Sequence, residues 1–198
     1  MRKNRKVALI LNIILFLLEA ITLVFAFKYN KLALEYYTND SNIFTMITSL
    51  LFIINYKFNK NYIKNLRFIS TVCLTVTFIV VLFIICPENN FNYKYYLLTD
   101  SFLMFHTICP IISFISYVFF EEPNNNNFVG IGLTIVYGII LIILNLLKIV
   151  NGPYSFLMIR QQGILLTIFW FTILITINLV VCFGLNKLSN KKQKGANV

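Results

Sequence analysis

The chain has 198 residues, of which 59% are hydrophobic and only 12% are charged, and its mean hydropathy is +0.78. Soluble globular domains are typically about 45–50% apolar and about 25% charged, so this composition excludes a soluble enzyme or binding module. The formal net charge is +10, but the basic residues cluster in short segments between and beyond the apolar runs. They form no basic face interleaved with aromatic side chains, so we expect no nucleic-acid partner. Membrane lipids are the expected partners instead.

Apolar runs of membrane-spanning length recur along the whole sequence. A helix needs about 20 apolar residues to cross a bilayer, and short polar or proline-containing segments separate the runs. The sequence therefore predicts an all-α fold, a single membrane domain over residues 1–198 and a polytopic integral membrane protein with a six-transmembrane-helix bundle. The predicted spans are about 7–27, 38–56, 68–86, 98–120, 128–150 and 163–185.

Charge asymmetry predicts the orientation of this bundle. Six crossings place both termini on one side, and most of the 17 Lys and Arg residues fall on that side, in the N-terminal segment, the loop at 57–67 and the tail. Because Lys and Arg favour cytoplasmic loops, we predict a multi-pass protein of the cell membrane with both termini in the cytoplasm. The acidic loop at 121–127 is the one segment that does not fit.

Polar residues follow one face of the second predicted span. Thr38, Asn42, Thr45 and Ser49 are spaced by four, three and four residues, which places them on one helical stripe. Such a stripe must face the bundle interior, where Ser, Thr and Asn side chains commonly hydrogen-bond between helices. Helix packing alone explains the stripe, and a catalytic hydroxyl within it is the alternative.

Two ionisable side chains lie inside predicted spans. His106, the only histidine, would lie about 10–14 Å below the polar start of the fourth span by helix rise, and Pro110 frees a main-chain carbonyl near it. Glu19 lies near the middle of the first span. Ionisable groups at this depth are costly and often mark functional sites. The alternative for His106 is a neutral ring that a neighbouring hydroxyl or carbonyl satisfies.

The cysteines give no sign of a metal site. Cys73, Cys86, Cys109 and Cys182 lie in or beside apolar runs and lack metal-ligand spacing. We expect buried thiols, no metal and no cofactor, with one Cys86–Cys109 bridge as an alternative.

Three short motifs resemble one known group of proteins. The segment YTNDSN at 37–42 opens the second span, Pro110 follows His106 by four residues, and GPYSFL at 152–157 lies between the last two spans. Together with the span count, these motifs resemble the bacterial branch of the androgen-induced/FAR-17a-like family of small multi-span membrane proteins. The resemblance covers residues 30–160.

The resemblance implies a hydrolase. Animal relatives in that family are integral-membrane hydrolases that act on fatty acid esters of hydroxy fatty acids, with a threonine nucleophile and a histidine. By position these would be Thr38 as nucleophile and His106 as base, with a lipid ester as substrate. Asn42, one turn from Thr38, and the hydroxyl of Tyr137 are candidates for stabilising the oxyanion.

Two other functions fit the same sequence. A proton-coupled carrier would use Glu19 and His106 as a relay across the membrane midplane. Six spans with no evident internal repeat make a small carrier, so a homo-oligomer is expected for it. An accessory membrane protein would use the polar groups for packing only. The hydrolase needs Thr38 and tolerates loss of Glu19, whereas the carrier needs Glu19 and tolerates Thr38→Ala.

Overall fold

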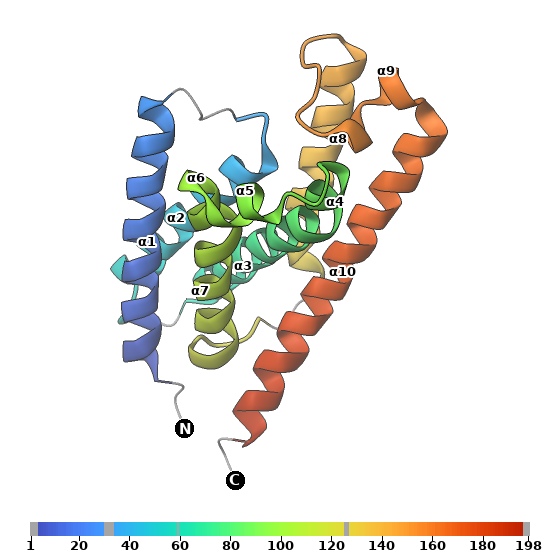
Figure 1. The fold of residues 1–198 in the computed structure, drawn as a ribbon. Helices are drawn as coiled ribbons and strands as arrows, with labels where there is room; N and C mark the ends of the chain where they lie inside the picture. Colours follow the sequence, from blue (N-terminus) through green and yellow to red (C-terminus); the bar gives the residue numbers. More distant parts are fainter. Residues whose placement is uncertain (1–3, 30–33, 59, 125–126, 196–198) are drawn as a thin grey trace.

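The computed structural model describes residues 4–29, 34–58, 60–124 and 127–195, and within these ranges the chain is an all-α bundle without a β-strand (Figure 1). Three π-helical segments, Val81–Ile85, Leu103–Ile108 and Ser116–Phe120, continue or interrupt the longer helices. Short 3₁₀ turns lie at Asn127–Gly130 and Ser155–Leu157. The α-helices are α1 (Arg5–Lys28), α2 (Tyr37–Ile54), α3 (Asn61–Val80), α4 (Cys86–Glu88), α5 (Tyr93–Leu98), α6 (Asp100–Phe102), α7 (Cys109–Ile115), α8 (Gly132–Leu146), α9 (Ile159–Gln162) and α10 (Ile164–Gly195).

Within the described ranges, five continuous helical segments are long and apolar enough to cross a membrane, which confirms the predicted class of polytopic all-α protein. They are Arg5–Lys28, Asn61–Glu88, Asp100–Phe120, Phe128–Leu146 and Ile164–Lys191. The predicted span at 38–56 forms α2, whose first half is too polar for the same criterion. The predicted stripe of Thr38, Asn42, Thr45 and Ser49 is nevertheless buried, and α2 packs against α1 and α3. The stripe predicted from the sequence therefore does face the interior.

The boundaries of three predicted spans differ from the structure. The third, predicted at 68–86, begins at Asn61, so the second half of the expected basic loop at 57–67 is helical. The fifth, predicted at 128–150, has its α-helix end at Leu146, and Lys148 with φ +63° turns the chain away from the helix axis. The last, predicted at 163–185, continues to Gly195. Charge composition marked the third and sixth boundaries in the sequence, but a charged residue can continue a helix.

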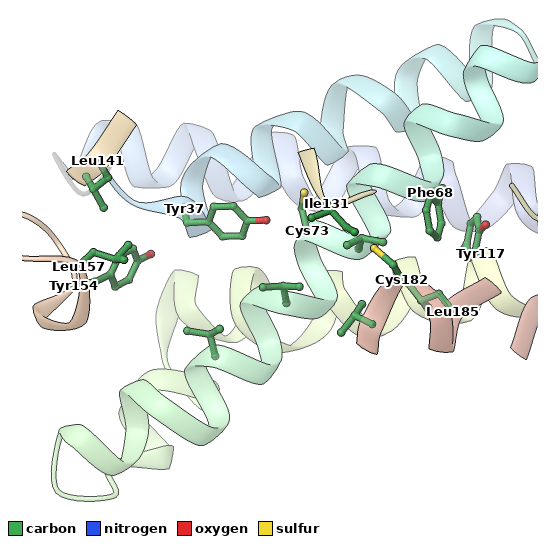
Figure 2. Packing of buried hydrophobic residues seen from close by; sticks show 14 of the residues in the cluster. Tyr37, Phe68, Cys73, Tyr117, Ile131, Leu141, Tyr154, Leu157, Cys182 and Leu185 are labelled. Atoms are coloured by element: carbon green, nitrogen blue, oxygen red, sulfur yellow. The ribbon is translucent and has the colours of Figure 1, made fainter. Parts of the chain in front are cut away.

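The main apolar core surrounds α3. Phe68 and Cys73 of α3 pack with Cys182 and Leu185 of α10, as Figure 2 shows. Val72 and further side chains from α2, α8 and the loop after α8 belong to the same cluster. All four cysteines are free and buried, so the alternative of a Cys86–Cys109 bridge is wrong. The first turns of α1 and the last turns of α10 lie at the same end of the bundle (Figure 1), an arrangement that an even number of crossings requires.

A glycine pair tests this packing. A Cβ added at Gly130 would meet Cys182 Sγ at 2.8 Å and Val72 Cγ2 at 3.0 Å, whereas one added at Gly132 meets nothing within 4 Å. We expect Gly130→Ala to lower the free energy of unfolding in detergent by about 1–3 kcal/mol, because it overpacks a filled core. Gly132→Ala, the matched control, should be neutral or stabilising by up to about 1 kcal/mol. Equal unfolding midpoints for the two variants would contradict the close approach of the Asn127–Gly130 turn to α3 and α10.

Candidate functional site

Thr38 and His106 meet inside the bundle. Thr38 lies in the first turn of α2 and His106 in the π-helical segment Leu103–Ile108, and both side chains are buried. His106 Nε2 and Thr38 Oγ1 are 3.3 Å apart, which is near the outer limit of a hydrogen bond and within the range expected for an unliganded catalytic pair. The structure thus brings together the two residues that the sequence put forward as nucleophile and base.

The other ring nitrogen of His106 fixes which atom carries the proton. His106 Nδ1 is 2.7 Å from the main-chain carbonyl oxygen of Tyr96, at the short helix α5. A carbonyl can only accept a hydrogen bond, so Nδ1 carries the hydrogen and Nε2 of the neutral ring presents a lone pair to Thr38. Phe102 stacks on the imidazole, with ring centroids 5.0 Å apart and an interplanar angle of 9°. The neighbouring groups therefore set both the position and the tautomer of the ring.

The local helix geometry explains where His106 points. In its π-helical segment the Cys109 N–H donates to the carbonyl of Met104, five residues earlier. The next residue, Pro110, has no N–H to donate to the Phe105 carbonyl, and that carbonyl accepts from Nδ2 of Asn42 at 3.4 Å. The proline thus frees a carbonyl beside His106, as the sequence predicted. Such π-bulges redirect side chains and are frequent at functional sites.

An apolar cavity of about 50 Å³ opens next to Thr38. Thr38 is one of the residues that line it, whereas His106, whose Nε2 contacts the Thr38 hydroxyl, is not. The wall is almost entirely apolar, although tyrosines and threonines are among the residues that form it. The aromatic residues among those lining it are Tyr37, Tyr137, Tyr154, Phe156 and Phe171.

The two candidate oxyanion donors are near the site but already bonded. Asn42 Nδ2 donates to the Thr38 carbonyl at 2.6 Å as well as to Phe105. Tyr137 lines the cavity, and its hydroxyl donates to the main-chain carbonyl of Glu35 at 2.7 Å. Each would have to release a carbonyl before it could bind an oxyanion. Their assignment from the sequence stays a prediction.

Glu19 is fully buried in α1, as its mid-span position suggested. Its carboxyl lies against the Cys109 thiol, and among the described residues neither carboxyl oxygen has a partner with ordinary hydrogen-bond geometry. Cys109 follows His106 by three residues, but no hydrogen bond links Glu19 to His106 in the described part of the chain. The proton relay therefore lacks a hydrogen-bonded connection between its two members there.

The structure also contains a buried ion pair that the sequence analysis did not predict. Arg67 of α3 was assigned to a loop and Glu121 to a short acidic loop, yet both are buried and Arg67 Nη2 is 3.1 Å from Glu121 Oε1. Arg67 Nε also donates to Oε2 at 3.2 Å, so the contact is bidentate. The Arg67 guanidinium also donates to the hydroxyls of Ser49, Ser70 and Ser113. The Glu121 carboxylate accepts from Ser116 and Asn12.

A signal for this pair was present in the sequence. Arg67 is followed at three and four residues by Ser70 and Thr71, which continues a polar helical face into the third span. Glu121 belonged to the one loop that departed from the expected charge asymmetry. An acidic residue in that loop and a basic residue that begins a polar helical face carry opposite charges, and opposite charges inside a membrane protein are expected to pair.

Comparison of the chain with protein-family models, curated proteins and solved structures finds no match.

Proposed function

We propose that this protein is a membrane-embedded ester hydrolase that acts on lipid esters, with Thr38 as nucleophile and His106 as general base. The observation that carries the proposal is the directed contact between the two side chains. The Nε2 lone pair faces the Thr38 hydroxyl at 3.3 Å, while the Tyr96 carbonyl holds Nδ1. A threonine hydroxyl becomes an effective nucleophile when a positioned base takes its proton, and a third group that orients the base completes the arrangement.

The chemistry follows from these contacts. His106 Nε2 takes the proton of Thr38 Oγ1 as this oxygen bonds to the ester carbonyl carbon, and the carbonyl π pair moves onto oxygen. Collapse of this tetrahedral species breaks the ester C–O bond, and the leaving alkoxide takes the proton from Nε2. Water then attacks the acyl-threonine with the same proton transfers, which releases the acid and restores the hydroxyl. The Tyr96 carbonyl stabilises the imidazolium that forms twice in this cycle.

The surroundings of Thr38 favour an apolar ester. The cavity on its open side is lined mostly by apolar side chains, and the bundle has the composition of a membrane protein. At about 50 Å³ the cavity accommodates the ester group and not a long acyl chain, so chain binding requires the cavity to open. The segments at 37–42, 106–110 and 152–157 resemble a family whose animal relatives hydrolyse lipid esters, and this resemblance supports the proposed substrate class.

Active-site labelling tests the proposal. The purified protein would be treated with a fluorophosphonate probe, and the labelled residue identified by mass spectrometry. We expect wild-type protein to be labelled at Thr38 and Thr38→Ala to lose the label. Thr45→Ala is the matched control, because Thr45 is a buried threonine of the same helix whose hydroxyl donates only to the Ser41 carbonyl. It should label like wild type.

The carrier hypothesis gives the opposite pattern. Failure of the wild type to react, under conditions that label a known membrane hydrolase, would reject the activated threonine. Proton flux in vesicles that Glu19→Gln abolishes and Thr38→Ala leaves intact would then favour the carrier.

A further inference from the structure

The hydrolase proposed above leaves its oxyanion donor unassigned, and the structure offers a group outside the earlier candidates. Asn42 Nδ2 and the Tyr137 hydroxyl both donate to main-chain carbonyls. The Tyr37 hydroxyl is paired with Thr134 Oγ1 at 2.7 Å. A donor engaged in this way must break one hydrogen bond to make another, which reduces the benefit of preorganisation.

Tyr154 differs from these donors in position and in partners. It lies in the loop after α8, is only 9% exposed and lines the cavity together with Thr38. Its hydroxyl interacts with the Thr38 side chain, at the site where an ester would be attacked, and with the main chain of Tyr37 and Thr38. The main-chain contacts lower the pKa of the phenol, as N–H groups that donate to its oxygen do, so they do not use the hydroxyl hydrogen. The ring is held by an edge contact with Tyr36, at a centroid distance of 6.1 Å, and by stacking on Phe156 at 5.2 Å.

We propose that Tyr154 is a catalytic residue of this hydrolase, whose hydroxyl donates a hydrogen bond to the substrate carbonyl oxygen as Thr38 attacks. The inference rests on the proposed function. The tyrosine keeps its proton throughout, because the oxyanion needs a donor and the proton of Thr38 goes to His106. The negative charge formed from the carbonyl π pair is stabilised by the hydrogen bond alone, as in an oxyanion hole.

The ionisation state of Tyr154 is suited to this role. Burial raises the pKa of its phenol to about 12, so the group remains protonated, and able to donate, over the whole neutral range. The rigid ring also places the hydroxyl with little loss of side-chain freedom, since its two aromatic neighbours already fix the orientation.

The segment that carries Tyr154 is anchored at defined points. Gly152 has φ +81° and Gly163 has φ +82°, so both ends use backbone conformations that favour glycine. Between them, the Ser155 hydroxyl donates to Glu88 of α4, and Gln162 Nε2 donates to the Phe156 carbonyl at 2.7 Å. These contacts hold the loop against the cavity, although the loop is distant from Thr38 in the sequence.

The test is hydrolysis of p-nitrophenyl butyrate in detergent micelles by wild type, Tyr154→Phe and Tyr36→Phe. Phenylalanine keeps the ring contacts and removes only the hydroxyl. We expect Tyr154→Phe to lower kcat by about 10²–10³-fold with KM changed by less than about threefold, because the lost interaction belongs to the transition state. Tyr36→Phe, which removes a partly exposed hydroxyl from the adjacent ring, should retain wild-type kcat.

The possible failures are distinguishable. If wild type hydrolyses the ester and is labelled at Thr38, but Tyr154→Phe keeps kcat within about threefold, the role of Tyr154 is wrong and the hydrolase stands. A large kcat loss in Tyr137→Phe with none in Tyr154→Phe would transfer the role to Tyr137. If wild type neither hydrolyses the ester nor labels at Thr38, the proposed function fails and the role of Tyr154 fails with it.

Discussion

Arg67→Met is expected to lower the free energy of unfolding by about 3–5 kcal/mol, the cost typical of breaking a buried ion pair by removing one partner. Arg67 and Glu121 have side chains only 1% and 3% exposed, and their contact is bidentate. Without the guanidinium, the Glu121 carboxylate stays in a low-dielectric interior with only hydroxyl and amide donors. Desolvation of that charge is then uncompensated.

A peripheral pair supplies the matched control. Lys64, one turn before Arg67, is 2.6 Å from Glu122, and these side chains are 22% and 28% exposed. Lys64→Met should cost only about 0.2–1 kcal/mol, because water already solvates both charges. Midpoints from denaturation of mixed micelles with SDS would measure the two variants side by side.

The double variant separates pairing from packing. Arg67→Met with Glu121→Leu removes both charges, and we expect it to be more stable than either single variant because no buried charge remains. Destabilisation that adds across the two sites would mean that the pair is not coupled and that its side chains contribute only as packed volume.

The position of Arg67 shows which part of the fold could not be predicted from the sequence. Hydropathy and spacing located the apolar helices and the inward stripe of α2, because those properties are local to one helix. Arg67 closed a basic run and was assigned to a loop, although the residue is tolerated inside α3 once Glu121 neutralises it. Pairing between helices depends on which faces meet, and helical periodicity alone does not contain that information.

The candidate site, too, was predictable only in the properties that are local to one helix. Composition marked His106 as an ionisable group at depth, and spacing placed Thr38 on an inward face, but only the resemblance to a family joined the two. The Tyr96 carbonyl that orients the imidazole is a main-chain group, so no side-chain pattern indicated it. Tyr154 belonged to the motif at 152–157 between the last two predicted spans, and its place beside Thr38 depends on how that loop folds against the cavity.

His106→Gln is expected to reduce kcat for ester hydrolysis by about 10²–10⁴-fold, the range usual for loss of a general base. Glutamine has a similar reach and can still hydrogen-bond the Thr38 hydroxyl, but its amide does not take up a proton near neutral pH. The substitution removes the basic Nε2 lone pair that faces Oγ1 at 3.3 Å, and with the ring it also removes the Nδ1–H donated to Tyr96 and the stacking on Phe102. KM should change little, since the proton moves only in the transition state.

A variant of Phe102, whose ring stacks on His106, tests whether His106 acts as a base or only through packing. Phe102→Leu removes the stacking on His106 and leaves both ring nitrogens with their partners. The loss of this aromatic contact should lower the free energy of unfolding by about 0.5–1.5 kcal/mol, and kcat should fall less than about tenfold. If His106→Gln and Phe102→Leu reduce kcat equally, His106 acts by packing and not as a base. If Thr38→Ala is inactive while His106→Gln keeps wild-type kcat, another group must deprotonate the threonine, and the contact between Thr38 and His106 is structural.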